Sequence, residues 1–231
     1  MMKTGSDPVS SVALFSDAET SRVPKPSQLS WTAKRGLDVS VAATALFLLL
    51  PLLVLVAAAI WATDGKPPIF KHNRLGRNGR LFGCLKFRSM VANGDAVLAA
   101  HLATNPRAQA EWDETHKLTD DPRVTAIGHV LRKTSIDELP QLWNILKGEM
   151  SLVGPRPIVE AEKTRYGSAL TTCFSVPPGL TGLWQVSGRS DTSYAERVAL
   201  DLDYAGRWSL RRDIDIILRT IPAVLAQRGS R

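Results

Sequence analysis

The stretch DVSVAATALFLLLPLLVLVAAAIWATD, Asp38–Asp64, decides the fold class predicted for this chain. About 25 uncharged and mostly apolar residues separate its two terminal aspartates, whereas a membrane helix needs about 20. A soluble helix that is apolar on all sides over this length is rare. A long polar region precedes the stretch, which argues against a signal peptide. We therefore predict a helix that inserts into a membrane.

Pro51 lies at the centre of this run, where its missing N–H removes a helical hydrogen bond and kinks the helix. Basic residues flank both ends of the run: Lys34, Arg35, Lys66, Lys71, Arg74, Arg77 and Arg80. The positive-inside rule draws both flanks to the cytoplasm, which favours a re-entrant helix that returns to the face it entered. A straight span with its N-terminus outside is the alternative.

The pattern divides the chain of 231 residues into three parts. Residues 1–33 are rich in Ser, Pro, Thr and Asp, and we predict a disordered or loosely attached tail. The membrane helix occupies residues 34–66, and a cytoplasmic domain occupies residues 67–231. The net charge of +7 and the pI near 9.7 indicate anionic partners: nucleic acid, phosphorylated substrates or an anionic membrane surface.

Cysteine and histidine spacing argues against two kinds of site. Cys84 and Cys173 lie far apart and outside any CxxC pattern, which indicates a reducing compartment and no disulfide framework. The four histidines show none of the spacings of a zinc site: His72, His101, His116 and His129.

The cytoplasmic domain is predicted to be mainly α-helical with one small β-hairpin. The hairpin covers residues 69–90, and Asn78 and Gly79 supply the positive-φ positions of its turn. Helices are predicted over residues 91–103, 107–117, 159–167 and 194–204, and a short strand over 183–186. A last helix follows Ser209, and its apolar stripe fits either an anionic membrane surface or a protein core: Leu210, Ile214, Ile217, Ile221 and Leu225.

The stretch TSIDELPQLWNILKGEMSLVGPRP, Thr134–Pro157, contains the candidate site. Ser135 and Glu138 fit a capping box, but that register would place Pro140 inside the helix. A helix that starts with Pro140 leaves Asp137 and Glu138 just before its positive end, and Gly148 then ends it. In both registers two carboxylates meet free amides, which also attract phosphate.

Basic residues complete the candidate site. Arg156 is held between Pro155 and Pro157, a stiff backbone that suits bidentate phosphate contact. Further candidates are Lys86 and Arg88, two apart on a predicted strand, with Arg123, Arg132 and Arg189. For any one of these arginines a solvated surface position is the simpler interpretation. An ionised Asp attacking phosphorus needs cations, supplied by Arg, Lys or Mg²⁺, and the acid pair offers oxygen ligands to the metal.

Four segments occur here in one order: KRGLDVSVA, LFGCLKFRSM, DDPRVTAIGHVLRKTSIDELPQLWNILKGEMSLVGPRP and PPGLTGLWQVSGRS. Together they closely resemble the bacterial sugar transferase family, the monotopic polyprenyl-phosphate phosphoglycosyl transferases. The resemblance covers residues 34–225 and is closest to the short members that begin exopolysaccharide repeat units. It identifies residues 67–231 as a catalytic domain with amphipathic interfacial helices.

The resemblance implies a two-step reaction. Asp137 would attack the β-phosphate of a UDP-sugar, with Glu138 as its partner, and UMP would leave a phosphosugar on the enzyme. Undecaprenyl phosphate would then attack and form a polyprenyl-diphosphate sugar. Mg²⁺ is expected at Asp137 and Glu138, and phosphate contacts at Arg156 and Arg88. The helix break of the family often carries Ser-Pro, where this chain has Leu50-Pro51.

The resemblance also implies a location and partners. The protein is expected in the bacterial inner membrane, with the catalytic domain on the cytoplasmic face. Its expected partners are a UDP-sugar, with glucose or galactose as the common choices, undecaprenyl phosphate and membrane lipids, and not nucleic acid. A homodimer stays open.

Two other functions fit parts of the sequence. A membrane-anchored basic scaffold without catalysis explains the charge and the anchor, but neither the acid pair nor the stiff Arg156 loop. A conventional glycosyltransferase would release UDP and usually carries a DxD metal motif. Asp213-Ile214-Asp215 has those letters, but we expect both acids to be solvated in the middle of a helix.

Overall fold

The computed structural model describes residues 27–115, 118–188 and 192–225. Helix α2, Gln28–Asp64, begins at the N-cap Ser27, whose side chain accepts a hydrogen bond from the Ser30 amide, and ends at Gly65 in the left-handed region. Residues 28–33 are therefore helical, contrary to the tail predicted over residues 1–33, because Ser27 supplies a cap upstream of the apolar run. The rest of that tail lies outside the described residues.

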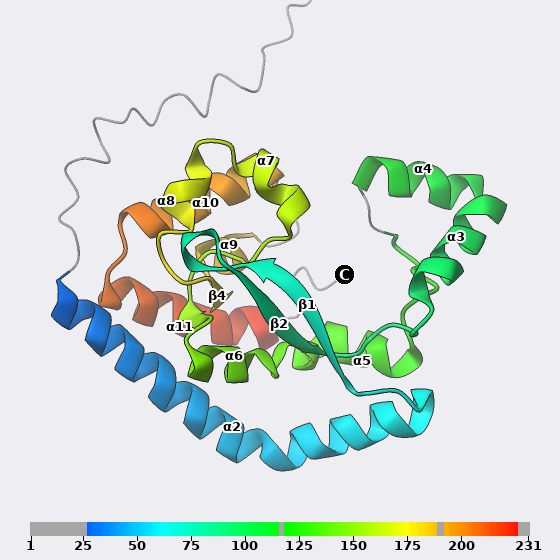
Figure 1. Ribbon diagram of the computed structural model, residues 1–231, viewed down its shortest axis with the longest axis horizontal. Helices are drawn as coiled ribbons and strands as arrows, with labels where there is room; N and C mark the ends of the chain where they lie inside the picture. Colours follow the sequence, from blue (N-terminus) through cyan, green and yellow to red (C-terminus); the bar gives the residue numbers. More distant parts are fainter. Residues whose placement is uncertain (1–26, 116–117, 189–191, 226–231) are drawn as a thin grey trace, which may run out of the picture.

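Helix α2 is long and apolar enough to cross a membrane, judged by length and composition, with a mean hydropathy of 2.7 in its most apolar window. Only 11% of that window is buried against the rest of the protein. Pro51 lies inside the helix, and Figure 1 shows α2 bent near its middle. The predicted kinked apolar helix is thus present.

The predicted β-hairpin is confirmed. Strands β1, Ile69–Leu75, and β2, Leu81–Phe87, pair antiparallel, with Ile69 opposite Phe87 at the open end. The connection contains the short 3₁₀ turn η2, Arg77–Gly79, in which Asn78 and Gly79 have φ of 55° and 75°. These are the left-handed positions that the Asn-Gly pair tolerates.

A helical hairpin follows the strands. Helix α3, Gly94–Thr104, ends at Asn105, and helix α4, Pro106–Thr115, follows it. The bounds of both helices lie close to the predicted ones. Figure 1 shows these two helices at the edge of the molecule. Helix α5, Ala126–Thr134, is capped by Thr125 and leads into the turn η3, Ile136–Glu138.

The centre of the domain is built from short elements. Helix α6, Gln141–Lys147, precedes strand β3, Ser151–Val153, which pairs in parallel with β4, Gly179–Thr181. Between them lie η4, Glu160–Glu162, α7, Lys163–Tyr166, and α8, Ala169–Cys173. The single helix predicted over residues 159–167 is therefore two shorter pieces, and Gly167, at φ 50°, ends the second.

The strand predicted over residues 183–186 is wrong, because β4 ends at Thr181 and α9, Leu183–Ser187, is helical. Tight backbone contact sets this arrangement: a Cβ on Gly179 would lie 2.1 Å from the Gly154 amide nitrogen. Two glycines thus bring β3 and β4 together, and the chain turns into α9 directly afterwards.

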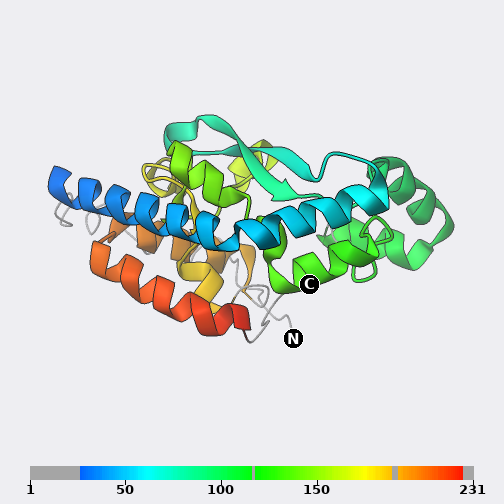
Figure 2. The ribbon, with the colours of Figure 1, turned by 90° about the horizontal axis from the view of Figure 1, so that it is seen from below.

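Two longer helices close the domain. Helix α10, Tyr194–Gly206, is capped by Ser193, and α11, Leu210–Leu225, follows it. The main core cluster joins α2, α6, β3, α10 and α11, for example through Ala42, Ile145, Val153, Tyr204 and Ile216. Figure 2 shows α2 and α11 running side by side along one face.

Helix α11 packs one part of its surface against the protein core and exposes another part. Ile216 is fully buried, whereas Ile214, Leu218 and Ile221 are exposed by 47%, 61% and 56%. Of the predicted stripe, Ile217 packs against the core and Ile214 and Ile221 are exposed, whereas the fully buried Ile216 lies outside that stripe. Asp213 is 1% exposed, so the expected solvation of Asp213 is wrong, because the buried Lys34 amine pairs with it at 2.6 Å.

Candidate active site

The acid pair lies in the short turn between α5 and α6. Ser135 adopts φ 58°, and within the described residues its side chain makes no capping hydrogen bond, so the capping box with Glu138 is absent. Helix α6 begins at Gln141 with Pro140 as its N-cap and ends at Gly148, whose φ is 80°. The acids therefore precede the helix, as the alternative register predicted.

Asp137 and Glu138 differ in their surroundings. Asp137 is 8% exposed, and burial raises its pKa to about 6, against the opposing charge of Lys86. Lys86 Nζ lies 2.6 Å from Glu138 Oε1 and 3.8 Å from Asp137 Oδ2. One cation thus bridges both carboxylates, and Glu138 holds the shorter contact.

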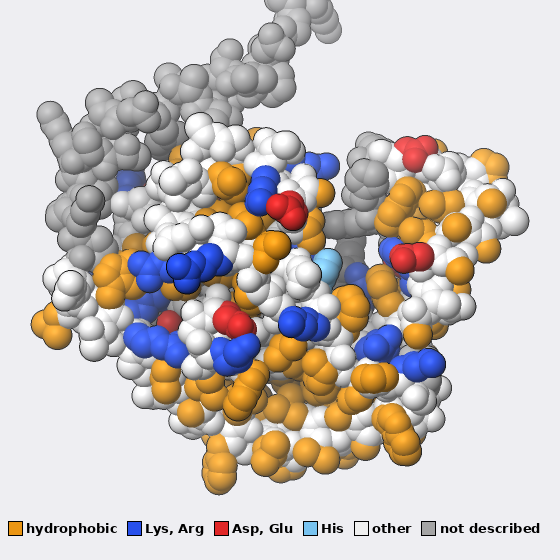
Figure 3. Space-filling model, in the orientation of Figure 1, with side chains coloured by type: hydrophobic (Ala, Val, Ile, Leu, Met, Phe, Trp, Pro, Cys, Tyr) orange, Lys and Arg blue, Asp and Glu red, His pale blue; other side chains and the backbone are white. Residues whose placement is uncertain are grey.

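Glu138 lines a pocket of about 300 Å³, including its opening to solvent, and Asp137 is the residue just before it in the chain. Its walls come from the β-hairpin, the start of α6, the Arg156 loop, β4 and α9: Arg74, Cys84, Lys86, Glu138, Gln141, Arg156, Pro157, Gly179, Leu180 and Gln185. In Figure 3 Lys and Arg side chains gather in the middle of the face around a small acidic patch. Such a pocket suits an anionic ligand.

The Arg156 loop is held on both sides. Pro155 and Pro157 are buried, and the Pro155 carbonyl accepts a 2.9 Å hydrogen bond from the Gly179 amide. The Arg156 guanidinium lies 5.7 Å from the Trp184 ring centroid, and the Arg197 guanidinium lies 5.3 Å from the same centroid. Strand β4 and Trp184 therefore fix the direction in which Arg156 points.

The other predicted cations are placed differently. Arg88 Nε donates to the Pro67 carbonyl at 3.0 Å, and β2 ends at Phe87, so strand alternation stops before Arg88. The Arg123 guanidinium donates hydrogen bonds to both carboxylate oxygens of Asp121 and lies 5.1 Å from the Trp112 ring centroid. Arg132 lies in the last turn of α5, close enough for its charge to lower the pKa of Asp137. Arg189 lies outside the described residues.

The structure brings Lys86, Glu138, Arg156 and Pro157 to one pocket, and it adds residues that the sequence analysis did not select. Arg74 was counted only as a membrane-flanking charge. It lies on β1 opposite Phe82, two positions along the hairpin from the pair His72–Cys84 and four from the pair Phe70–Lys86. Strand alternation from Lys86 across this register is the signal that would have found Arg74.

Gln141 was also missed. The residue is 3% exposed and lines the pocket, yet no hydrogen bond joins its side-chain amide to any described residue. Its amide lines the pocket, where a ligand or water can form hydrogen bonds with it. No sequence signal separates Gln141 from an ordinary first residue of a helix.

The donor set of a metal site can be examined in the same way. Among the described residues, no group of three or more His, Cys, Asp or Glu side chains could hold a metal ion. Asp137 and Glu138 form a pair, and Mg²⁺ is often bound by one or two carboxylates plus substrate phosphates. The acid pair fits that type of site.

Comparison with known proteins shows to which family this chain belongs. Residues 29–227 match the bacterial sugar transferase family, and the chain belongs to this family. It is 54% identical over 198 residues to the exopolysaccharide production protein ExoY of Sinorhizobium fredii (strain NBRC 101917 / NGR234), covering 86% of this chain and 88% of that protein. The chain is therefore of the short ExoY-like type.

Longer relatives align over the same region. The undecaprenyl-phosphate galactose phosphotransferase of Salmonella typhimurium is 48% identical over 85% of this chain, which spans 41% of that protein. The UDP-glucose:undecaprenyl-phosphate glucose-1-phosphate transferase of Caulobacter vibrioides is 42% identical over 83% of this chain and 69% of its own length. The family match over residues 29–227 contains the acid pair and the whole pocket.

Proposed function

We propose that this protein is an undecaprenyl-phosphate hexose-1-phosphate transferase that begins exopolysaccharide assembly. The observation that carries the proposal is the convergence of Glu138, Lys86 and Arg156 on one pocket in a bacterial sugar transferase, with Asp137 held beside Glu138 by the same Lys86. Relatives named for galactose and for glucose transfer indicate UDP-galactose or UDP-glucose as the donor.

The first step joins the sugar phosphate to the enzyme. An Asp137 carboxylate oxygen attacks the β-phosphorus of the UDP-hexose, the bond from that phosphorus to the bridging oxygen breaks, and UMP leaves with this oxygen. An anion must approach an anionic centre, so neutralising cations are required. Arg74 and Arg156 line the pocket, and Lys86 is already bound to the acid pair.

The second step frees the enzyme. A phosphate oxygen of undecaprenyl phosphate attacks the same phosphorus, and the Asp137 carboxylate leaves. Burial of Asp137 limits hydrolysis of the phosphosugar intermediate because it keeps water away. The raised pKa still leaves Asp137 mostly ionised near neutral pH, so attack needs no separate base.

Mg²⁺ is part of the proposal. Asp137 and Glu138 would hold it through carboxylate oxygens, and when bound it would neutralise phosphate charge. The short contact between Lys86 and Glu138 then orients the second carboxylate.

The proposed location is the cytoplasmic face of the bacterial inner membrane. Helix α2 carries a row of exposed apolar side chains, including Phe47, Leu48, Val54 and Leu55. Figure 3 shows hydrophobic side chains along the edge where α2 runs, and α11 adds its exposed side chains beside it. We propose that α2 enters the bilayer as a helix re-entrant at Pro51 and that α11 lies at the interface.

Nucleotide release tests the proposal. Membranes containing the protein are given undecaprenyl phosphate, Mg²⁺ and one of several UDP-hexoses, and UMP and lipid product are measured. We expect UMP with the preferred sugar and no turnover from Asp137→Asn. Asp215→Asn is the matched control, because Asp215 is exposed on α11 and pairs only weakly with Arg219.

Each alternative function has its own result. Release of UDP in place of UMP would indicate transfer of the sugar without its phosphate. No release from any UDP-hexose would favour the binding scaffold. Full activity in Asp137→Asn would remove Asp137 from the role of nucleophile.

A further inference from the structure

The segment KRGLD, Lys34–Asp38, near the start of α2 faces the protein interior. Lys34 and Asp38 are 3% and 4% exposed, although they flank the most apolar run of the chain. Charged side chains are buried this completely only when they are paired. Lys34 therefore does not serve as a free charge for the membrane surface.

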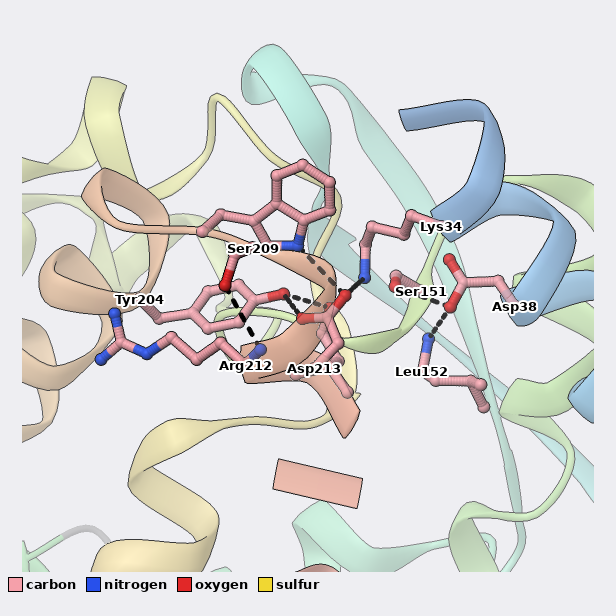
Figure 4. Close-up of polar contacts among 10 residues, drawn as sticks. Lys34, Asp38, Ser151, Leu152, Tyr204, Ser209, Arg212 and Asp213 are labelled. Atoms are coloured by element: carbon pink, nitrogen blue, oxygen red, sulfur yellow. Dashed lines mark hydrogen bonds and ion pairs between the residues drawn. The ribbon is translucent and has the colours of Figure 1, made fainter. Parts of the chain in front are cut away.

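The Lys34 ammonium takes part in a buried network of hydrogen bonds beside strand β3, which Figure 4 shows. Its ammonium lies 2.6 Å from Asp213 Oδ2 on α11 and donates to the Val153 carbonyl at 3.1 Å. Tyr204 donates to Asp213 Oδ1 at 2.7 Å, and the Trp208 indole donates to Oδ2 at 3.0 Å. The charge pair is thus fully hydrogen-bonded, as a stable buried pair requires.

Asp38 lies one helical turn after Lys34 and binds the same strand. Its Oδ1 accepts hydrogen bonds of 3.0 Å from the Ser151 hydroxyl and from the Leu152 amide, as Figure 4 shows. Two side chains of α2 therefore hold the backbone of β3 on consecutive residues. The chain continues from β3 through Gly154 and Pro155 directly to Arg156.

Arg35 holds helix α6, which follows the acid pair. Its guanidinium donates to the carbonyls of Ile145 and Leu146 at 2.5 and 2.7 Å. These carbonyls lie in the last turn of α6, where the Ile145 carbonyl also accepts a 2.9 Å hydrogen bond from the Gly148 amide. Helix α6 begins three residues after Glu138 and fixes the acid pair at its opposite end.

We propose that Lys34, Arg35 and Asp38 are positioning residues that set the separation between the acid pair and Arg156. The first turns of α2 hold α6 through Arg35, and they hold β3 through Lys34 and Asp38. The acid pair before α6 and Arg156 after β3 are therefore both positioned by one helix. The inference rests on the proposed function, because the separation matters only if the acid pair and Arg156 act on one phosphate-bearing substrate. The same helix would then anchor the protein and align its site.

The matched variants Asp38→Ala and Asp38→Asn test the inference in the full chain, purified in detergent. Asn keeps a carboxamide oxygen for the Ser151 and Leu152 donors, whereas Ala has none. Misplacement by 1 Å can cost about 10²-fold in rate. We expect Asp38→Ala to lower the kcat of UMP release by about 10- to 100-fold, with a small change in KM. Asp38→Asn should recover most of this rate.

Thermal midpoints separate positioning from folding. The double variant Lys34→Met/Asp213→Leu removes both members of one buried ion pair, so neither is left without its partner, and Tyr204 keeps the Val153 carbonyl as an acceptor. We expect it to keep a thermal midpoint near that of the parent protein and still to release UMP slowly. Asp215→Asn, exposed on the same helix as Asp213, serves as the control with unchanged rate and midpoint.

The outcomes are distinct. Folded Asp38→Ala or Lys34→Met/Asp213→Leu with the parental kcat would overturn the inference, and so would activity that follows the thermal midpoint in every variant. If Asp38→Ala does not fold, a slow Asp38→Asn with a normal midpoint would also contradict it, because Asn retains the two hydrogen bonds. Failure of the parent protein to release UMP would instead be failure of the proposed function.

Discussion

At the scale of single residues, Gln141 and Asp201 are two buried polar groups that the core does not explain. Gln141 faces the pocket, one helical turn after the acid pair, with no hydrogen bond to any described residue. Asp201 is fully buried on α10 and accepts a 2.8 Å hydrogen bond from the Tyr166 hydroxyl. The first group lies where substrate would bind, and the second lies behind the Arg156 loop.

Gln141→Met should separate substrate affinity from stability. Met has a similar volume and no hydrogen-bonding amide, so the free protein loses no hydrogen bond between described residues. The substrate complex loses a hydrogen bond worth about 1 kcal/mol or more. We expect KM for the UDP-hexose to rise roughly five- to tenfold, following that energy, with a thermal midpoint that is unchanged or higher. A lower midpoint with unchanged KM would show that Gln141 is structural.

Asp201 should make stability depend on pH. Burial raises its pKa from the ordinary 3.8 to about 7. The folded protein therefore holds this proton where the unfolded chain has lost it, so the stabilising effect is complete below pH 3.8 and is lost as pH rises through about 7. Between pH 5 and 8 the loss amounts to about 3 kcal/mol.

Denaturation of the parent protein and of Asp201→Asn at a series of pH values measures this effect. The carboxamide of Asn does not titrate in this range, so the free energy of unfolding of the variant should fall less between pH 5 and 8. Parallel curves for the two proteins would contradict the raised pKa of Asp201.

Residue positions were predictable from the sequence where the signal was local. The acid pair and the stiff backbone around Arg156 follow from neighbouring residues, and Glu138 and Arg156 line the same pocket. Lys34 and Asp213 were read as solvent- or membrane-facing, because the contact that buries them joins residues 179 positions apart. Arg74 was missed for a related reason, since its role depends on the register of the hairpin and on Arg156 beyond it.

At the scale of elements, turn and cap chemistry decided which predictions held. Asn78-Gly79 marked the hairpin, and Pro140 with Gly148 marked the limits of α6, because each needs a particular backbone conformation. Strand β4 and helix α9 are too short for periodicity to distinguish. Their conformations are set by the close approach of Gly179 to Gly154, which the sequence does not reveal.

Helix α11 provides a test of the membrane-facing surface. An environment-sensitive fluorophore on Leu218→Cys should shift to shorter wavelength when anionic vesicles are added, because Leu218 is 61% exposed beside α2. The native Cys84 and Cys173 are buried, so labelling should be confined to the new thiol. Thr164→Cys is the control, since α7 lies across the molecule from α2 in Figure 1. Equal shifts at both positions would exclude α11 as the interfacial helix.

At the scale of the whole molecule, α2 has two separate tasks along its length. Its first turns carry the buried Lys34 and Asp38, which hold the catalytic domain. The residues around and beyond Pro51 expose apolar side chains, among them Phe47, Leu50 and Val54. Because the first turns of α2 are bound to the domain, the N-terminal end of α2 lies on the same side of the membrane as the domain. If α2 is re-entrant, the basic residues after the helix must lie on that side as well.

Cysteine labelling at the two ends of α2 tests this topology directly. Leu29→Cys and Lys66→Cys place thiols at exposed positions before and after the apolar run, while Cys84 and Cys173 are buried. In intact spheroplasts a membrane-impermeant maleimide should reach neither thiol, and in inside-out vesicles it should reach both. A straight span would expose one end to each side. Labelling of Leu29→Cys in spheroplasts would therefore exclude the re-entrant helix, and it would also require Lys34 and Asp38 to leave β3, with loss of UMP release.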